Sequence, residues 1–112
     1  MAKNDKKAGN TSKRRDEYEE IFRDVDETER KLVDRLIDEC VWYEEQMLAL
    51  RDVPHLAIHP TKPHLQRLTP AAKLYKEYAT SYMNAIRILL NTLRKVESTA
   101  QDDLLRRLEE FA

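Results

Sequence analysis

The sequence contains a single glycine, Gly9, and its four prolines all lie between residues 54 and 70. Sandwiches, barrels and phosphate-binding loops depend on tight turns and close backbone approach, both of which favour glycine strongly. Outside residues 54–70, no proline interrupts a helix. We therefore predict an all-α fold, and a length of 112 residues allows one domain at most.

The composition is that of a soluble protein, with 37% charged residues against 41% apolar residues. Cys40 is the only cysteine, so an internal disulfide cannot form, which fits a reducing cytoplasm. No apolar run approaches the roughly 20 residues that span a bilayer, and no signal-peptide core follows the N-terminus. We expect a cytoplasmic protein that does not bind membranes.

Residues 1–15 form a basic arm. Six basic residues against the acidic Asp5 give it a net charge of +5, which leaves −6 for the remaining chain out of the total of −1. Because the arm has no large apolar residue after Met1, we expect it to be disordered. Its cations either contact DNA phosphates or belong to a solubilising tail. These cations are Lys3, Lys6, Lys7, Lys13, Arg14 and Arg15.

Two helices are expected in the first half of the chain. A short helix after the arm would bury the apolar residues Tyr18, Ile21, Phe22 and Val25. Asp26 and Glu29 resemble a capping box at the start of a second helix of about 25 residues, whose apolar residues recur at intervals of three and four. We place the acidic residues of this helix, including Glu44 and Glu45, on its outward face.

A second long helix is predicted to begin at Thr69 and Pro70 and to continue to residue 97. Apolar residues recur along it every seven positions, at Tyr75, Tyr82, Leu89 and Val96. Further apolar residues extend this seam over more than half of the circumference, which indicates neighbours on two sides. We predict self-association through this helix, although the seam could serve only the hairpin within one chain. The predicted interface consists of Leu74, Tyr75, Tyr78, Tyr82, Ile86, Leu89 and Leu93.

The polar strip of the same helix is basic. Its cations are Lys73, Lys76, Arg87, Arg94 and Lys95. They are candidates for DNA contact, and the alternative is that they pair with the acidic face of the preceding helix. Residues 98–112 are predicted to form a short amphipathic helix that binds a partner through Leu104, Leu105, Leu108 and Phe111.

Residues 51–69 join the two long helices and contain all three histidines. Pro60 prevents His59 from adopting a helical conformation, and in an extended chain His55 would lie about 13 Å away, too far for simple chelation. We predict a stiff connector without a metal. No residues have the spacing of a nucleophile and its base, so we predict neither an enzyme nor a cofactor.

These features together predict an antiparallel helical hairpin of two long amphipathic helices, with short flanking helices, that assembles as an oligomer. Its predicted parts are the disordered arm at residues 1–15, a hairpin oligomerisation domain at residues 16–97 and the short helix at residues 98–112. A chain of this size buries little surface by itself, so packing between subunits would complete its core.

Residues 20–97 resemble the short small-terminase subunits of tailed phages. The resemblance is carried by the acidic segment Asp24–Glu29, the pair His59–Pro60 and the stretch "TPAAKLYKEY" at residues 69–78. It implies a non-enzymatic factor of the host bacterial cytoplasm that forms a homo-oligomeric ring and binds double-stranded viral DNA. It also implies delivery of that DNA to the large terminase subunit, which holds the ATPase and nuclease.

One departure from this family concerns sequence recognition. Larger members carry a helix-turn-helix domain, which this sequence does not show, so we do not expect this chain alone to read a DNA sequence. The alternative function is a helical-hairpin oligomeric module that binds a protein and no nucleic acid.

Overall fold

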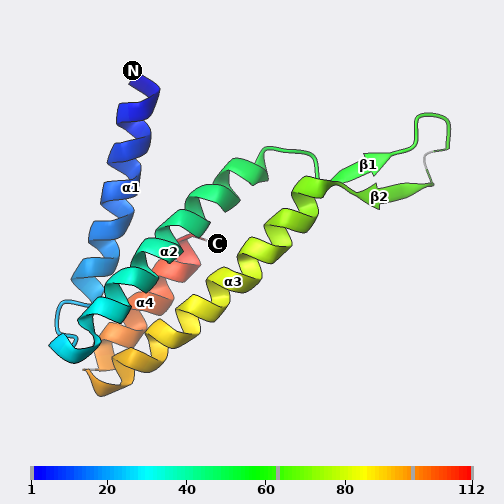
Figure 1. The fold of residues 1–112 in the computed structure, drawn as a ribbon. Helices are drawn as coiled ribbons and strands as arrows, with labels where there is room; N and C mark the ends of the chain where they lie inside the picture. The colour runs from blue at the N-terminus through cyan, green and yellow to red at the C-terminus, as the bar shows by residue number, and fades with distance from the viewer. Residues whose placement is uncertain (1, 63, 97, 112) are drawn as a thin grey trace.

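The computed structural model describes residues 2–62, 64–96 and 98–111, with the side chains of residues 2–11 and 98 outside the description. The described residues are mostly helical, which confirms the predicted all-α class apart from one small hairpin of two strands (Figure 1). The elements are α1 (Ala2–Ile21), α2 (Glu27–Arg51), β1 (Leu56–Ile58), β2 (Gln66–Leu68), α3 (Pro70–Thr92), the short 3-10 helix η1 (Leu93–Lys95) and α4 (Ser98–Phe111).

The long helices α2 and α3 pack side by side and run in opposite directions (Figure 1). Helix α1 contacts α2 and α4, and α4 also contacts η1. The apolar core takes side chains from all four α-helices, including Tyr18 of α1, Ile37 of α2, Leu89 of α3 and Leu104 of α4, each fully buried. The two flanking helices therefore belong to the same core as the long helices.

Helix α2 has the predicted length of 25 residues and begins after Asp26. The predicted capping box does not form, because the Asp26 side chain makes no capping hydrogen bond. Oε1 of Glu29 instead accepts a hydrogen bond from Lys95 Nζ at 2.9 Å. The first-turn acids still lie where the positive end of the helix dipole favours them.

Helix α3 begins as predicted. The backbone amide of Ala72 donates to Thr69 Oγ1 at 3.2 Å, and Pro70 occupies the first turn. Thr69 Oγ1 also donates to the carbonyl oxygen of Pro54 at 2.7 Å. This second bond ties the start of α3 to the segment that leaves α2.

The basic arm differs from the prediction of disorder, because α1 continues through it to Ala2. In the second half of α1 and the turn after it, Tyr18 and Phe22 are fully buried, so packing anchors the helix there. Once a helix is nucleated, each added residue forms one hydrogen bond, and the lysines and alanines of the arm are good helix formers. The backbone of this first half extends beyond the other helices in Figure 1.

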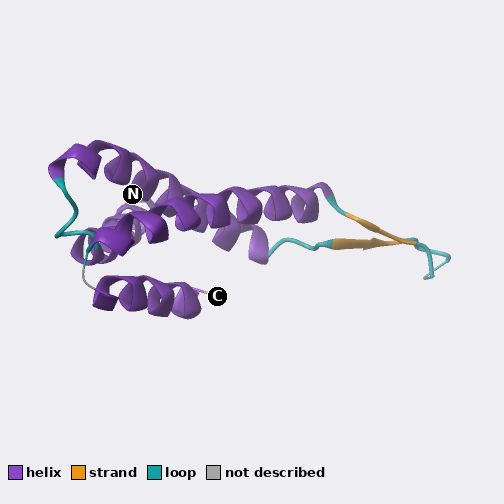
Figure 2. Cartoon of the chain, turned by 90° about the horizontal axis from the view of Figure 1, so that it is seen from below, coloured by secondary structure: helices purple, strands orange, loops and turns teal. Residues whose placement is uncertain are grey.

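Residues 51–69 form a projecting hairpin instead of a simple connector. Strands β1 and β2 pair antiparallel, with Leu56 opposite Leu68, Ala57 opposite Arg67 and Ile58 opposite Gln66. Figures 1 and 2 show the hairpin extending away from the helices at the end where α2 and α3 meet it.

The histidines of the hairpin take part in local hydrogen bonds. His59 Nδ1 accepts from the backbone amides of Thr61 and Lys62, each at 3.2 Å. His55 Nε2 lies 3.0 Å from the carbonyl oxygen of Leu50. Within the described residues, no group of three or more His, Cys, Asp or Glu side chains is placed to hold a metal ion, and no described helix is long and apolar enough to cross a membrane.

Candidate nucleic-acid interface

Four cations line the exposed side of α3 and of η1, which follows it directly. Lys73, Lys76, Arg87 and Arg94 are all exposed, and none forms an ion pair with another described residue. At 100° per residue, Lys76 and Arg87 lie within about 20° of each other on α3, and Lys73 lies about 60° from Lys76. Arg94 follows in η1. The rise of 1.5 Å per residue gives about 21 Å from Lys73 to Arg87. We call these four residues the α3 stripe.

Lys95, the fifth cation predicted for this strip, is engaged by α2. Its hydrogen bond to Glu29, reinforced by the charge of that carboxylate, raises the pKa of Lys95. Pairing with the acidic helix, the alternative for the whole strip, is therefore observed for Lys95 and for no member of the α3 stripe among the described residues.

Charge is strongly segregated along the chain. Residues 53–96 contain seven basic residues and one acidic residue, Glu77, for a net charge of +6. Residues 16–52 contain fourteen acidic and five basic residues, for a net charge of −9. The α3 stripe therefore lies in a positively charged segment of the chain, which favours contact with polyanions.

The basic arm offers fewer free cations than predicted. Arg14 lies 3.2 Å from Glu44 and 3.3 Å from Glu45, and Arg15 forms ion pairs with Glu19 and Asp38. These two arginines serve intramolecular contacts because α1 packs against α2. Lys13 is exposed, and the side chains of Lys3, Lys6 and Lys7 lie outside the described residues.

The predicted oligomer interface divides into two groups. Tyr82, Ile86, Leu89 and Leu93 are at most 4% exposed and form part of the chain's own core. This is a correction, because side chains buried within one chain have no free surface for another. Leu74 is 38% exposed, and Tyr75 and Tyr78 are partly buried.

The predicted partner-binding face of α4 is also mostly internal. Leu104 is fully buried, and Leu108 and Phe111 pack against the core. Only Leu105 is substantially exposed, at 45%. The amphipathic pattern of α4 is satisfied inside the molecule, where Leu104 belongs to the core, and the partner-binding face stays a prediction.

Sequence reasoning missed a buried ionic cluster around Glu44, which is fully buried and not on the outward face of α2. Arg107 binds it through two bonds, Nη1 to Oε2 at 2.6 Å and Nη2 to Oε1 at 2.7 Å. The hydroxyls of Tyr18 and Tyr82 donate to Oε2 at 2.5 and 2.7 Å, and Arg14 Nη1 donates to Oε1 at 3.2 Å. We call these five residues the Glu44 cluster, and they come from all four α-helices.

Burial by itself would raise the pKa of Glu44, but the hydrogen bonds from Arg107, Tyr18 and Tyr82 outweigh it and hold the pKa below its usual value. Burial raises the pKa of Tyr18 and of Tyr82, and it raises the pKa of the neighbouring Cys40 thiol to about 12. At neutral pH the cluster therefore contains an ionised carboxylate, a cationic Arg107 and neutral hydroxyl and thiol groups.

The Glu44 cluster holds helices together. Both carboxylate oxygens already accept two or more hydrogen bonds, and the side chain has no exposed surface through which a substrate would enter. The Arg107 guanidinium also lies 3.8 Å from the centre of the Tyr18 ring, in a cation–π contact. Each helix thus contributes a polar group whose partners lie on the other helices.

A signal for the cluster was present in the sequence. Glu44 follows Cys40 by four residues and precedes Met47 by three, so it shares the buried face of α2. In α4, Arg107 follows Leu104 by three residues and precedes Phe111 by four, so it shares the inward face of that helix. The position of these charged residues on the helix, more than their charge, indicated burial.

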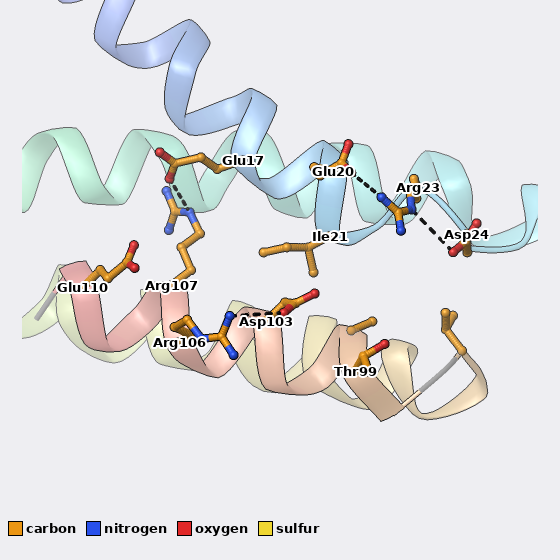
Figure 3. Close-up of a pocket in the computed structure, with 12 residues that line it drawn as sticks. Glu17, Glu20, Ile21, Arg23, Asp24, Thr99, Asp103, Arg106, Arg107 and Glu110 are labelled. Carbon is orange, nitrogen blue, oxygen red and sulfur yellow. Dashed lines mark hydrogen bonds and ion pairs between the residues drawn. The ribbon is translucent and has the colours of Figure 1, made fainter.

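A groove of about 330 Å³ separates parts of α1 and α4 (Figure 3). Figure 3 shows that charged side chains at its rim pair with one another: Glu17 with Arg107, Glu20 and Asp24 with Arg23, and Asp103 with Arg106. Because its arginines are already neutralised by neighbouring carboxylates, this groove does not compete with the α3 stripe for an anion.

Comparison of the chain with protein-family models, with curated proteins and with solved structures found no match. A functional assignment must therefore come from the residues, their placement in the fold and the resemblance carried by residues 20–97.

Proposed function

We propose that this protein is a small-terminase-like packaging factor that binds double-stranded viral DNA, self-associates and delivers the DNA to a large terminase subunit. The observation that carries the proposal is the α3 stripe, four exposed cations that form no ion pair with the described residues.

The proposed contact with DNA is electrostatic. Lysine and arginine neutralise phosphates whatever the base sequence, and each neutralised phosphate contributes about −0.9 to the slope of log K against log salt. Four contacts per subunit would give a slope of about −3.6. Contacts from lysine and arginine to phosphates carry no sequence information, so binding through them is expected to be insensitive to sequence.

Self-association is the second component of the proposal. Several large apolar side chains of α2 and α3 remain exposed, among them Trp42 at 49% and Ile88 at 48%. A ring would present many stripes to one DNA molecule, and each further contact would form at high effective concentration once the first is made. Weak contacts per subunit would then give useful affinity.

The test removes the four charges of the stripe together, in the variant Lys73→Gln/Lys76→Gln/Arg87→Gln/Arg94→Gln. Affinity for a short DNA duplex, measured by fluorescence anisotropy across a salt series, is expected to fall. The slope per subunit is expected to shrink by about 0.9 for each phosphate that the variant no longer neutralises. Because all four side chains are exposed, the fold should be preserved, which circular dichroism checks.

A matched control removes four exposed cations elsewhere, in the variant Arg23→Gln/Lys31→Gln/Arg35→Gln/Arg106→Gln. It changes the net charge equally and should retain most of the affinity. An equal reduction of affinity in both variants would refute the stripe as the contact site. If the unaltered protein fails to bind DNA at low salt, the packaging function itself is wrong.

A second candidate function, an oligomeric module that binds proteins only, is favoured by one observation. The β1–β2 hairpin exposes Leu56, Ile58, Leu65 and Leu68, each 48% or more. The DNA measurement separates the two functions, because the module would not bind the duplex at any salt concentration. A neighbouring gene for a large terminase subunit is expected for the packaging function alone.

A further inference from the structure

The β1–β2 hairpin has one apolar face. Side chains of directly opposed residues lie on the same face of a sheet, and every second residue of a strand returns to it. The observed register therefore places Leu56, Ile58 and Leu68 together with Gln66. The three aliphatic side chains are 51%, 58% and 53% exposed.

This apolar face needs a cover. A two-stranded hairpin is marginal in water by itself and becomes stable when it packs against a helix or further strands. The hairpin extends away from the four helices in both views, so the helices of its own chain do not cover it (Figures 1 and 2). The cover must come from another molecule.

A matching surface lies on α2 and α3. The Trp42 ring packs edge-on against the rings of Tyr78 and Tyr43, with ring centroids 5.3 and 5.4 Å apart. These contacts join α2 and α3 into one surface. Leu74 lies one turn before Tyr78 on α3. Ile88 follows Leu74 by fourteen residues, which places the two about 40° apart around the helix axis. Trp42, Leu74 and Ile88 are 49%, 38% and 48% exposed. We call this the α2–α3 face.

The charges of the two surfaces are complementary. Residues 53–69 contain Lys62 and Arg67 and no acidic residue, so the hairpin carries a net charge of +2. Helix α2 contains seven acidic and four basic residues, for a net charge of −3. The exposed Asp38 and Glu39, about one turn before Trp42, pair with Arg15 and Arg35, so the complementarity rests on the net charge of α2. A basic, apolar hairpin therefore fits the acidic, apolar surface of α2 better than it fits another hairpin.

We propose that the hairpin of one copy packs its apolar face on the α2–α3 face of a second copy. The proposal rests on the self-association included in the proposed function and is independent of DNA binding. Because each copy offers two different surfaces, the contact either repeats head-to-tail in a ring or filament or forms twice across the two-fold axis of a dimer. On α3, each stripe residue lies about 100° or more around the helix from Leu74, and Arg87 lies about 100° from the adjacent Ile88, so the stripe stays free for DNA.

The decisive experiment uses two complementary variants. The hairpin variant Leu56→Ser/Ile58→Ser/Leu68→Ser keeps an intact α2–α3 face, and the face variant Trp42→Ser/Leu74→Ser/Ile88→Ser keeps an intact hairpin. Light scattering is expected to give a multimer for the unaltered protein and a monomer for each variant. An equimolar mixture is expected to form a heterodimer and nothing larger, because only one contact per pair remains possible.

Three results would overturn the proposal: an unaltered protein that is monomeric, a hairpin variant that keeps the native mass, or a mixture that stays monomeric. Leu105→Ser, which removes an exposed leucine outside both surfaces, should leave the native mass unchanged. Failure of assembly in that control as well would also refute the specific contact.

A second variant guards against misfolding. Lys62→Glu/Arg67→Glu keeps the apolar face and reverses the charge of the hairpin, so it should raise the concentration needed for assembly about tenfold or more at low salt. No change would refute the charge complementarity.

DNA binding is measured on the same samples. A monomeric hairpin variant should keep the salt slope per chain that the α3 stripe provides. If that slope falls, the hairpin contacts DNA and the proposal is wrong. If assembly behaves as proposed and no sample binds DNA, only the packaging function fails.

Discussion

The interior around Glu44 and the β1–β2 hairpin show opposite patterns of burial: charged groups are buried in the interior, and aliphatic groups are exposed on the hairpin. Inside, a carboxylate and a guanidinium are buried, and each is bound by several partners from the same chain. On the hairpin, the side chains of Leu56, Ile58 and Leu68 are each more than half exposed. The interior is complete within one chain, whereas the aliphatic side chains of the hairpin remain exposed.

The comparison shows that burial in this protein follows position in the fold more closely than hydropathy. The desolvation cost of a buried ion pair often exceeds its Coulombic gain unless further hydrogen bonds satisfy both ions. The Glu44 cluster meets that condition, because Tyr18, Tyr82 and Arg14 complete the coordination of the carboxylate. Breaking the pair and replacing the pair should therefore have very different effects.

The largest effect is expected from removing one ion of the pair. Arg107→Met leaves the Glu44 carboxylate buried without its main partner and should lower the free energy of unfolding by about 3–5 kcal/mol. The double variant Glu44→Leu/Arg107→Met should regain a large part of that stability. Urea denaturation of both variants and of the unaltered chain measures this. A decrease below about 1 kcal/mol in Arg107→Met would show that the interior depends little on the pair.

A smaller effect is expected from acid. The pKa of Glu44 is lower in the folded chain than the value of about 4.3 for an unfolded glutamate. The stability that this shift contributes is fully present above about pH 4.3 and is lost as pH falls through the folded pKa. Unfolding free energies measured from pH 7 downwards should therefore fall less steeply in Glu44→Gln than in the unaltered chain. Parallel curves would contradict a charged Glu44.

The smallest effect is expected from the exposed pair Lys95–Glu29, which serves as a matched surface comparison for the buried pair. Exposed ion pairs contribute little because solvent screens them and both side chains lose freedom. We expect Lys95→Gln to leave the urea midpoint unchanged within error. A destabilisation approaching that of Arg107→Met would remove the distinction between interior and surface charge.

Much of the helical architecture was predictable. The 25-residue helix α2, the cap formed by Thr69 and the burial of Tyr18, Phe22 and Val25 follow from spacing and local hydrogen bonding, which short stretches of sequence encode. The α3 stripe was also identified as a strip of cations. Its freedom from ion pairs with the described residues was not predictable, because that depends on where the acids of α2 lie.

Other features depend on distant residues or unusual local chemistry. Glu44 was placed outside because glutamate is rarely buried, and its partner Arg107 lies 63 residues away. The hairpin was not predicted because its tip lacks glycine. Nδ1 of His59 accepts hydrogen bonds from the backbone amides of Thr61 and Lys62. A side chain therefore satisfies amides that would donate to backbone carbonyls in a tighter turn.

The Glu44 cluster also has a consequence for biosynthesis. Glu44 leaves the ribosome well before Arg107, and until α4 has been made the carboxylate has no guanidinium from that helix to neutralise it. A nascent chain that closed α2 and α3 around Glu44 at that stage would bury a poorly compensated charge. We therefore expect the native packing to be completed only after residue 107 has emerged, so that one late arginine prevents premature closure during translation.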